Sequence, residues 1–153
     1  MRALRVFTVL AVVVAAGVAC KDNVTGIPAG LEVFTATLNG ANEAPTQVTT
    51  TATGTAIVTV LGNLVSWKVD ILTPIDSIIL GHIHRRAADS VAGNVRVDFK
   101  PDTTGQNFTG TVTVGSQVVD DSILAILRQG RGYVNIHTQL HPGGEIRGTL
   151  VKQ

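Results

Sequence analysis

The segment GTAIVTVLGNLVSWKVDIL, residues 54–72, decides the fold class of this chain. It contains two runs rich in β-branched residues, 54–61 and 64–72, and such residues favour extended backbone because they pack well on a pleated surface. Gly62 and Asn63 separate the runs, and a two-residue loop of this composition predicts a β-hairpin. From Val65 to Ile71 apolar residues occupy every second position, which predicts a strand with one buried face.

Further runs of the same kind lie on both sides of this hairpin. They cover residues 33–38, 77–84, 94–99, 108–114, 132–138 and 145–151. Together with the hairpin they make about eight short strands, which predicts an all-β antiparallel sandwich or barrel of the immunoglobulin-like or Greek-key type. Residues 121–129 differ, because their apolar residues have helical spacing, acidic residues begin the segment and Gly130 follows it. They predict one short helix between strands.

The composition of the whole chain excludes several classes of protein. The chain has 153 residues, one cysteine and a formal net charge of +1. This length suits a single domain with a moderate core. One cysteine cannot form an internal disulfide, which excludes a disulfide-stabilised scaffold. The near-neutral charge lacks the basic footprint of a nucleic-acid-binding protein, so we expect no nucleic-acid partner.

The N-terminal residues differ in composition from the rest. Arg2 and Arg5 precede an apolar run over residues 6–16, and small residues lead from there to Cys20. This order predicts a signal peptide over residues 1–19, since the apolar run is shorter than the roughly 20 residues of a membrane span. Cys20 stands where a bacterial lipoprotein carries its lipidated cysteine. We therefore expect an exported protein anchored to a membrane at the cell envelope, or a secreted or periplasmic one if Cys20 is not lipidated.

The remaining chain divides into a linker and one domain. Residues 20–30 combine Cys20 with glycine, proline and polar residues without periodicity, which predicts a flexible tether. Residues 31–153 then form the β domain. Removal of residues 1–19 takes away two arginines and leaves 10 basic and 11 acidic residues, so the mature chain is close to neutral.

All four histidines lie in two short segments. The first is Gly81-His82-Ile83-His84. On a strand, residues two apart point to the same side, so His82 and His84 share one face. The second segment is YVNIHTQLHPGGEIRG, residues 133–148, which contains the other two histidines.

Several residues of this second segment form a structural motif. Tyr133, Asn135 and His137 share one strand face, because they are two residues apart. Pro142, Gly143 and Gly144 predict a turn that joins the last two strands as a hairpin. Beyond the turn, Glu145 and Arg147 point to the same side as each other, where they could pair with a histidine or with Asn135.

These motifs resemble the CHRD domain, a module named for the animal antagonist chordin that also occurs in bacterial secreted proteins. The resemblance rests on GHIH at 81–84, YVNIHT at 133–138 and HPGGEIRG at 141–148, and it covers nearly all of residues 31–153. It implies an all-β fold that is immunoglobulin-like or related to copper/zinc superoxide dismutase. The resemblance implies no particular chemistry.

Three interpretations of the histidines follow. In the first they are structural and form hydrogen bonds within a polar sheet face. In the second His82, His84 and His137 bind zinc or copper, with His141 as a fourth ligand, since neutral imidazole suits both metals. The third is dismutase-type catalysis, which the His-x-His pattern suggests. We find no bridging-histidine segment, no downstream cluster of zinc ligands and no cysteine pair, and a shared fold does not carry a shared function.

Taken together, these patterns predict an exported, non-catalytic binding or structural module at the cell envelope. The resemblance to chordin suggests an extracellular or envelope protein partner. No cofactor is required in this interpretation. The alternative is a metal-binding or redox protein that uses copper or zinc on the histidine face.

Overall fold

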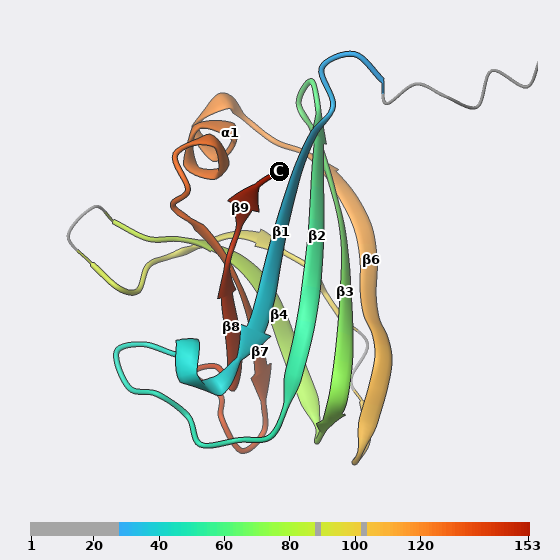
Figure 1. The fold of residues 1–153 in the computed structure, drawn as a ribbon, viewed down its shortest axis with the longest axis vertical. Coiled ribbons are helices and arrows are strands. Elements are labelled where there is room, and N and C mark those ends of the chain that lie inside the picture. The colour runs from blue at the N-terminus through green and yellow to red at the C-terminus, as the bar shows by residue number, and fades with distance from the viewer. Residues whose placement is uncertain (1–27, 88–89, 102–103) are drawn as a thin grey trace, which may run out of the picture.

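The computed structural model describes residues 28–87, 90–101 and 104–153, which form one curled antiparallel sheet with a short helix (Figure 1). The elements in chain order are β1 (Glu32–Asn39), the 3₁₀ turn η1 (Gly40–Asn42), β2 (Thr53–Leu61), β3 (Leu64–Ile75), β4 (Ile78–Arg85), β5 (Val95–Asp98), β6 (Phe108–Val118), α1 (Asp121–Arg128), β7 (Gly132–Thr138), β8 (Ile146–Thr149) and β9 (Val151–Lys152). The predicted signal peptide and Cys20 lie outside the described residues. No helix in the described ranges is long and apolar enough to cross a membrane.

The strands form two walls of a curled, barrel-like sheet. Their order in the sheet is β5-β4-β7-β8-β1-β2-β3-β6. In Figure 1, β1, β2, β3 and β6 lie side by side, while β4, β7 and β8 cross behind and beside them. Strand β6 pairs with β3 and β7 pairs with β4, so the chain passes from one wall to the other between β3 and β4 and again between β5 and β6. The prediction of an all-β antiparallel sandwich or barrel is confirmed.

The hairpin that decides the fold class has the predicted two-residue loop. Leu61 pairs with Leu64 across the loop, and the pairing continues to Gly54 opposite Ile71. Gly62 has a φ of +59°, a conformation that glycine adopts without steric cost. The alternate residues from Val65 to Ile71 are at most 7% exposed, so the period of two buries one face of β3 in the core.

The core fills the space between the two walls. It is built from aliphatic and aromatic side chains of nearly every strand, among them Phe34, Leu38, Val58, Ile83, Ile136, Ile146 and Leu150, all with no exposed surface. On β4 and β7 the core residues are Ile78, Ile83, Val134 and Ile136. Since strand side chains alternate, the histidines on either side of Ile83 must point away from the core.

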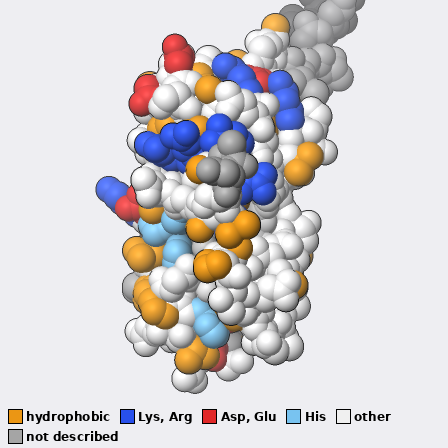
Figure 2. Space-filling view, turned by 90° about the vertical axis from the view of Figure 1, so that its left-hand side faces the viewer, with side chains coloured by type: hydrophobic (Ala, Val, Ile, Leu, Met, Phe, Trp, Pro, Cys, Tyr) orange, Lys and Arg blue, Asp and Glu red, His pale blue; other side chains and the backbone are white. Residues whose placement is uncertain are grey.

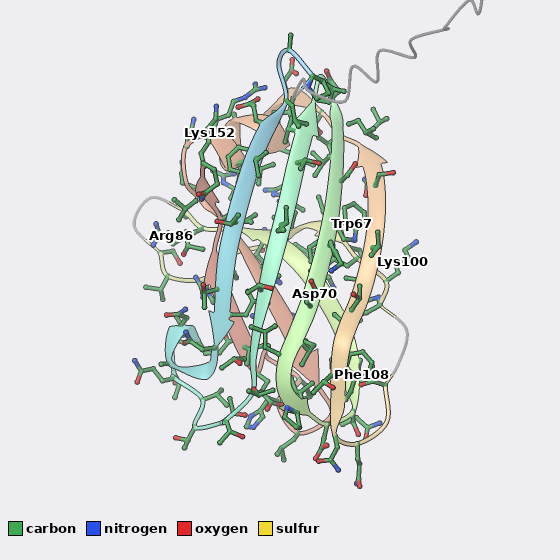
Figure 3. All side chains as sticks on the ribbon, turned by 45° about the vertical axis from the view of Figure 1, so that its right-hand side comes forward. Trp67, Asp70, Arg86, Lys100, Phe108 and Lys152 are labelled. Carbon is green, nitrogen blue, oxygen red and sulfur yellow. The ribbon has the colours of Figure 1, made fainter. Side chains whose placement is uncertain are left out.

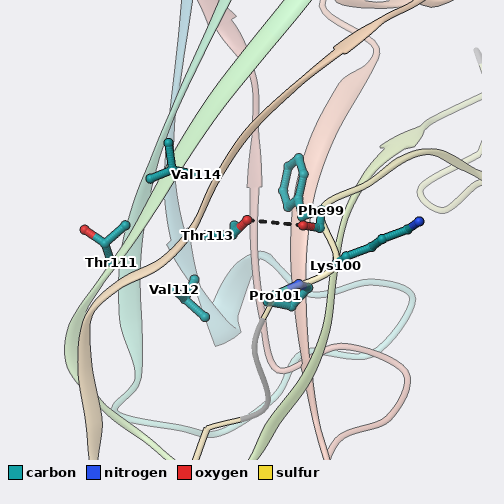
Figure 4. Close-up of a pocket in the computed structure, with 7 residues that line it drawn as sticks. All are labelled: Phe99, Lys100, Pro101, Thr111, Val112, Thr113 and Val114. Carbon is teal, nitrogen blue, oxygen red and sulfur yellow. Dashed lines mark hydrogen bonds between the residues drawn. The ribbon is translucent and has the colours of Figure 1, made fainter.

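Side chains close the barrel where the edge strands β5 and β6 meet. Trp67 lies on β3 beside β6 (Figure 3), and its Nε1–H donates to Thr113 Oγ1 over 3.2 Å. Thr113 Oγ1 in turn donates to the carbonyl oxygen of Phe99 over 3.2 Å, as Figure 4 shows. The rings of Trp67 and Phe99 are 5.1 Å apart. An open cavity of about 380 Å³ lies along this seam.

The helix closes one end of the barrel and is tied to the strands. The side chain of Asp120 accepts from the backbone N–H groups of Ser122 and Ile123, so it caps α1. Leu124, Ile126 and Leu127 are buried. The prediction of a short helix here is confirmed. At its last turn Arg128 pairs with Glu32 of β1, and Lys152 of β9 pairs with the same carboxylate. These two cations lower the pKa of Glu32 to about 2.

The last predicted strand differs from the observed one. Residues 145–151 were predicted as one strand, whereas the structure has two, β8 and β9, separated by Leu150. Strand β8 lies between β7 and β1 and pairs with both, whereas β9 pairs with β1, where Val151 lies opposite Thr35. Leu150, between the two strands, is fully buried, and its backbone N–H still donates to Gly132 at the start of β7.

Gly148→Ala tests the close approach of β8 and β1. A Cβ at Gly148 would overlap the backbone carbonyl of Thr37, so the two strands must separate. We expect a loss of about 1–3 kcal/mol in the free energy of unfolding, measured by urea denaturation. The matched control is Gly143→Ala, because no atom lies within 4 Å of a Cβ there. Equal effects of the two substitutions would contradict the packing argument.

Candidate metal centre

The residues of the histidine motifs gather on the outer face of β4, β7 and β8, opposite the core. His82 lies opposite Asn135, His84 lies opposite Tyr133, and Asn135 lies opposite Arg147 in the strand pairing. Although this face points away from the core, its polar residues are buried: His82 is 8%, His84 9%, His137 6%, Asn135 4% and Arg147 5% exposed. Figure 2 views the molecule from the side on which the histidines gather.

Three irregular segments bury this polar face. The segment after η1 contributes Glu43, which accepts from Asn135 Nδ2 over 3.4 Å. The segment between β4 and β5 contributes the carbonyl oxygen of Gly93, which lies 2.9 Å from His84 Nδ1. The turn between β7 and β8 contributes the carbonyl oxygen of Pro142, which lies 3.0 Å from His137 Nδ1. The histidine face therefore forms a polar layer between the sheet and its loops.

His82, His84 and His137 form a compact cluster. Their potential ligand nitrogens all lie within 4.8 Å of one another. The closest pair is His82 Nδ1 and His137 Nε2, 3.1 Å apart. The ring centroids are 5.3 Å apart for His82 and His84, 5.0 Å for His82 and His137, and 5.8 Å for His84 and His137. Two segments separated by about fifty residues thus meet, because β4 pairs with β7.

The backbone determines which nitrogen of two histidines carries the proton. A carbonyl oxygen can only accept a hydrogen bond. Nδ1 of His84 therefore donates to Gly93, and Nδ1 of His137 donates to Pro142. The Nε2 atoms of both rings are consequently unprotonated, and His137 Nε2 can accept a hydrogen bond from His82 Nδ1, 3.1 Å away. His84 Nε2 is buried and has no hydrogen-bond partner in the described part of the chain.

All three imidazoles favour the neutral form. Burial lowers the pKa of His82 and of His84 below the usual value for histidine. Burial also lowers the pKa of His137 to about 4, and the hydrogen bond to Pro142 opposes this only in part. A neutral imidazole is the form that binds metal.

His82 has a carboxylate behind it that was not among the predicted site residues. Its Nε2 lies 3.9 Å from Asp98 Oδ1, and Asp98 pairs with His82 across the β4–β5 ladder. Metal-binding histidines usually present their second ring nitrogen to a carboxylate or a carbonyl. In this cluster Asp98 stands behind His82, as Gly93 does behind His84 and Pro142 behind His137. The pairing of β4 with β5 places Asp98 directly opposite His82, so knowledge of this register would have identified Asp98.

Tyr133 and Arg147 extend the cluster toward β8. The rings of His84 and Tyr133 are stacked, with centroids 5.0 Å apart and planes inclined by 7°. The Cζ atom of Arg147 lies 3.6 Å from the centroid of the Tyr133 ring, which is a cation–π contact. One guanidinium N–H of Arg147 donates to the carbonyl oxygen of Val91. Arg147 thus contacts the tyrosine rather than a histidine.

Two other predicted site residues have roles outside the cluster. His141 lies in the turn after β7 and does not belong to the three-histidine group. Its carbonyl oxygen accepts from the backbone N–H groups of Thr138 and Gly144. Glu145 accepts from the hydroxyls of Thr50 and Thr138, over 2.8 and 2.7 Å. Glu145 therefore links the hairpin to the loop that carries Thr50, instead of pairing with a histidine or with Asn135 as predicted.

The glycines of the predicted turn differ in what surrounds them. Gly144 has a φ of +127°, and a Cβ there would overlap Asn135 and Glu43. Gly143, in contrast, is exposed and has open space around it. Pro142, Gly143 and Gly144 form the predicted turn, and the strands that it joins pair antiparallel. The turn thus lets the hairpin lie directly against the polar layer.

Glu43 and Asn135 have unpaired buried oxygens. Glu43 Oε1 and Asn135 Oδ1 are buried without a hydrogen-bond partner in the described residues. Burial raises the pKa of Glu43 to about 7, although Arg147 opposes the shift. Glu43 was not among the predicted site residues, because nothing in the sequence around it indicates its contact with β7.

Glu43→Gln tests the cost of ionising this buried carboxyl. In the folded state the pKa of Glu43 lies above its unfolded value of 4.5. The contribution of this group to stability is therefore largest below pH 4.5 and is lost as pH rises through 7. The amide cannot ionise, so the variant should gain stability over the wild type between pH 5 and pH 8, by about 2–3 kcal/mol. Urea denaturation at several pH values measures this difference.

Glu32→Gln provides the opposite control. The pKa of Glu32 is lowered by Arg128 and Lys152, so that carboxylate stabilises the fold in its ionised form. Its replacement should therefore lower the stability at pH 8. A difference between Glu43→Gln and the wild type that does not change with pH would contradict the assignment of a raised pKa to Glu43.

The comparisons with known proteins agree with the motifs that carry the histidines. The model of the CHRD domain matches residues 34–150, which include every strand from β2 to β8 and the whole polar layer. No curated protein and no solved structure matches the chain. Because the family model covers most of the sequence, the chain belongs to the CHRD domain family.

Proposed function

We propose that this CHRD domain is a non-catalytic metal-binding module that holds one copper or zinc ion through His82, His84 and His137. The observation that carries the proposal is the convergence of three neutral imidazoles whose ligand nitrogens lie within 4.8 Å of one another. Imidazole is a good ligand for both metals. The function is that of a binding module because the three side chains are buried, which limits access for a substrate.

The unpaired nitrogen of His84 favours metal binding over a purely structural role. A buried acceptor without a donor costs about 1–3 kcal/mol. A structural network would be expected to give His84 Nε2 a partner, yet the atom has none among the described residues. His82 and His137 do contact each other over 3.1 Å, which is what the structural interpretation requires. The two interpretations therefore differ most clearly at His84.

The cluster needs only small movements to accept an ion. Zinc–nitrogen bonds of about 2.0–2.1 Å place the nitrogens of a tetrahedral site roughly 3.3 Å apart. His82 Nδ1 and His137 Nε2 are 3.1 Å apart, close to this spacing, and the third nitrogen lies within 4.8 Å of them. His82 would then carry its proton on Nε2, next to Asp98. Three ligands leave one coordination position for water or another small molecule.

His84→Gln and His137→Gln test the metal centre. Elemental analysis and calorimetric titration of the purified wild type with zinc or copper should give one metal ion per chain. Each substitution removes one of three ligands, so we expect affinity to fall by more than about 100-fold. The unfolding midpoints of the metal-free variants show whether they remain folded. Retention of wild-type affinity by both variants would exclude the proposed ligand set.

His141→Gln is the matched control. This histidine belongs to the same sequence motif but lies outside the cluster, so the variant should bind metal as the wild type does.

A wild-type protein that binds neither zinc nor copper at micromolar concentration would refute the metal proposal and leave the structural interpretation. If copper is bound, a superoxide assay of the loaded protein tests the redox alternative directly.

We further propose that the chain is exported and anchored through Cys20. The order of charged, apolar and small residues before Cys20 supports this. Cys20→Ser is expected to release the protein from the membrane fraction or to block its maturation, which cell fractionation detects. A variant that fractionates like the wild type would contradict the lipid anchor. The proposed protein partner at the envelope is supported by the family resemblance to chordin.

A further inference from the structure

A second site lies on the same outer face, beside Tyr133. A pocket of about 400 Å³ opens there, and its lining includes Arg86, Arg147, Thr37, Asn42 and Thr149. Strands β1 and β8 contribute the two threonines and Arg147, while Asn42 and Arg86 come from η1 and the segment after β4. Figure 2 shows lysine and arginine side chains gathered above the histidines on this side of the molecule.

Arg147 places a nearly buried positive charge at this pocket. Its side chain is 5% exposed and packs on the ring of Tyr133. In the described residues only one of its N–H groups donates a hydrogen bond, to Val91. A guanidinium has five N–H donors, and Arg147 lines the pocket. In the described part of the chain, its other donors therefore have no protein acceptor and are available to a ligand in the pocket.

In the described part of the chain, the two arginines form no ion pair. Neither Arg86 nor Arg147 has a described carboxylate oxygen within 4.0 Å. Glu43 interacts electrostatically with Arg147 from a longer distance, and burial raises the pKa of that carboxyl to about 7. A buried cation without a close counter-ion is costly, and an anion in the pocket would offset that cost.

We propose that this pocket binds a small oxyanion, such as phosphate or a short carboxylic acid. The planar fork of Arg147 matches two oxygens of such a ligand. Arg86 adds a second positive charge, and Thr37 and Thr149, which carry hydroxyl donors, line the same pocket. This site is separate from the metal centre, and it does not depend on the metal proposal.

Titration of the full chain with inorganic phosphate tests the oxyanion site. The protein is first treated with a chelator, so that phosphate cannot bind through a metal. Calorimetry should show saturable binding with a Kd below about 1 mM. Arg86→Gln and Arg147→Lys should each weaken binding at least 10-fold, since the first removes a charge and the second replaces the fork by a point charge. No saturable binding to the wild type would overturn the proposal.

Three further variants make the test specific. Arg85→Gln removes the same charge from the neighbouring residue, which lines other cavities, and it should change affinity less than twofold. An equal loss in this variant would show general charge attraction and overturn the site. His137→Gln should leave phosphate binding unchanged, which separates this site from the metal centre. Asp89 lies outside the described residues. If Asp89→Asn binds phosphate more than 10-fold more tightly than the wild type, the Asp89 carboxylate is the natural partner of the arginines, and the proposal is overturned.

Discussion

The pairing of β4 with β7 is the interaction on which the rest of the structure depends. It places His82 opposite Asn135 and His84 opposite Tyr133, and it directs Ile83 and Ile136 into the core between the two walls. Because strand side chains alternate, the same register determines which residues lie side by side on both faces of the sheet. A slip of one residue would exchange the apolar core residues with the histidines, so the core itself holds the polar cluster in place.

The outer face of these strands is unusual because it is both polar and buried. In a typical antiparallel sheet one face packs on the core and the other contacts water. Here every residue of β7 is buried, since the loops after η1 and β4 and the turn before β8 cover its outer side. Burying polar groups is costly unless they find partners. Gly93 and Pro142 supply such partners for two histidines, whereas His84 Nε2, Glu43 Oε1 and Asn135 Oδ1 have none in the described ranges. These three atoms lie within the polar layer, where a ligand would complete their interactions, and a fourth unpaired atom, Arg96 Nε, belongs to β5.

Most of the fold could be predicted because its signals are local. Period-two alternation located β3 and β7, the Gly62–Asn63 loop located the first hairpin, and acidic residues with helical spacing located α1. The break at Leu150 could not be predicted, because it depends on the position of β1 at the end of the barrel. For the site, the sharing of one face by His82 and His84 followed from their spacing. The exclusion of His141 from the cluster did not, since spacing within a loop does not determine where a side chain lies.

The sequence by itself determined the strand pattern, the family and the set of histidines that can meet on one face. Local backbone preferences and alternation act over a few residues and are visible in the chain. Only the tertiary structure decided that β4 and β7 are neighbours, that loops bury their polar face, and that Asp98, Glu43 and the carbonyl oxygens of Gly93 and Pro142 surround the cluster. These contacts join segments far apart in the chain, and their geometry depends on how the whole sheet curls.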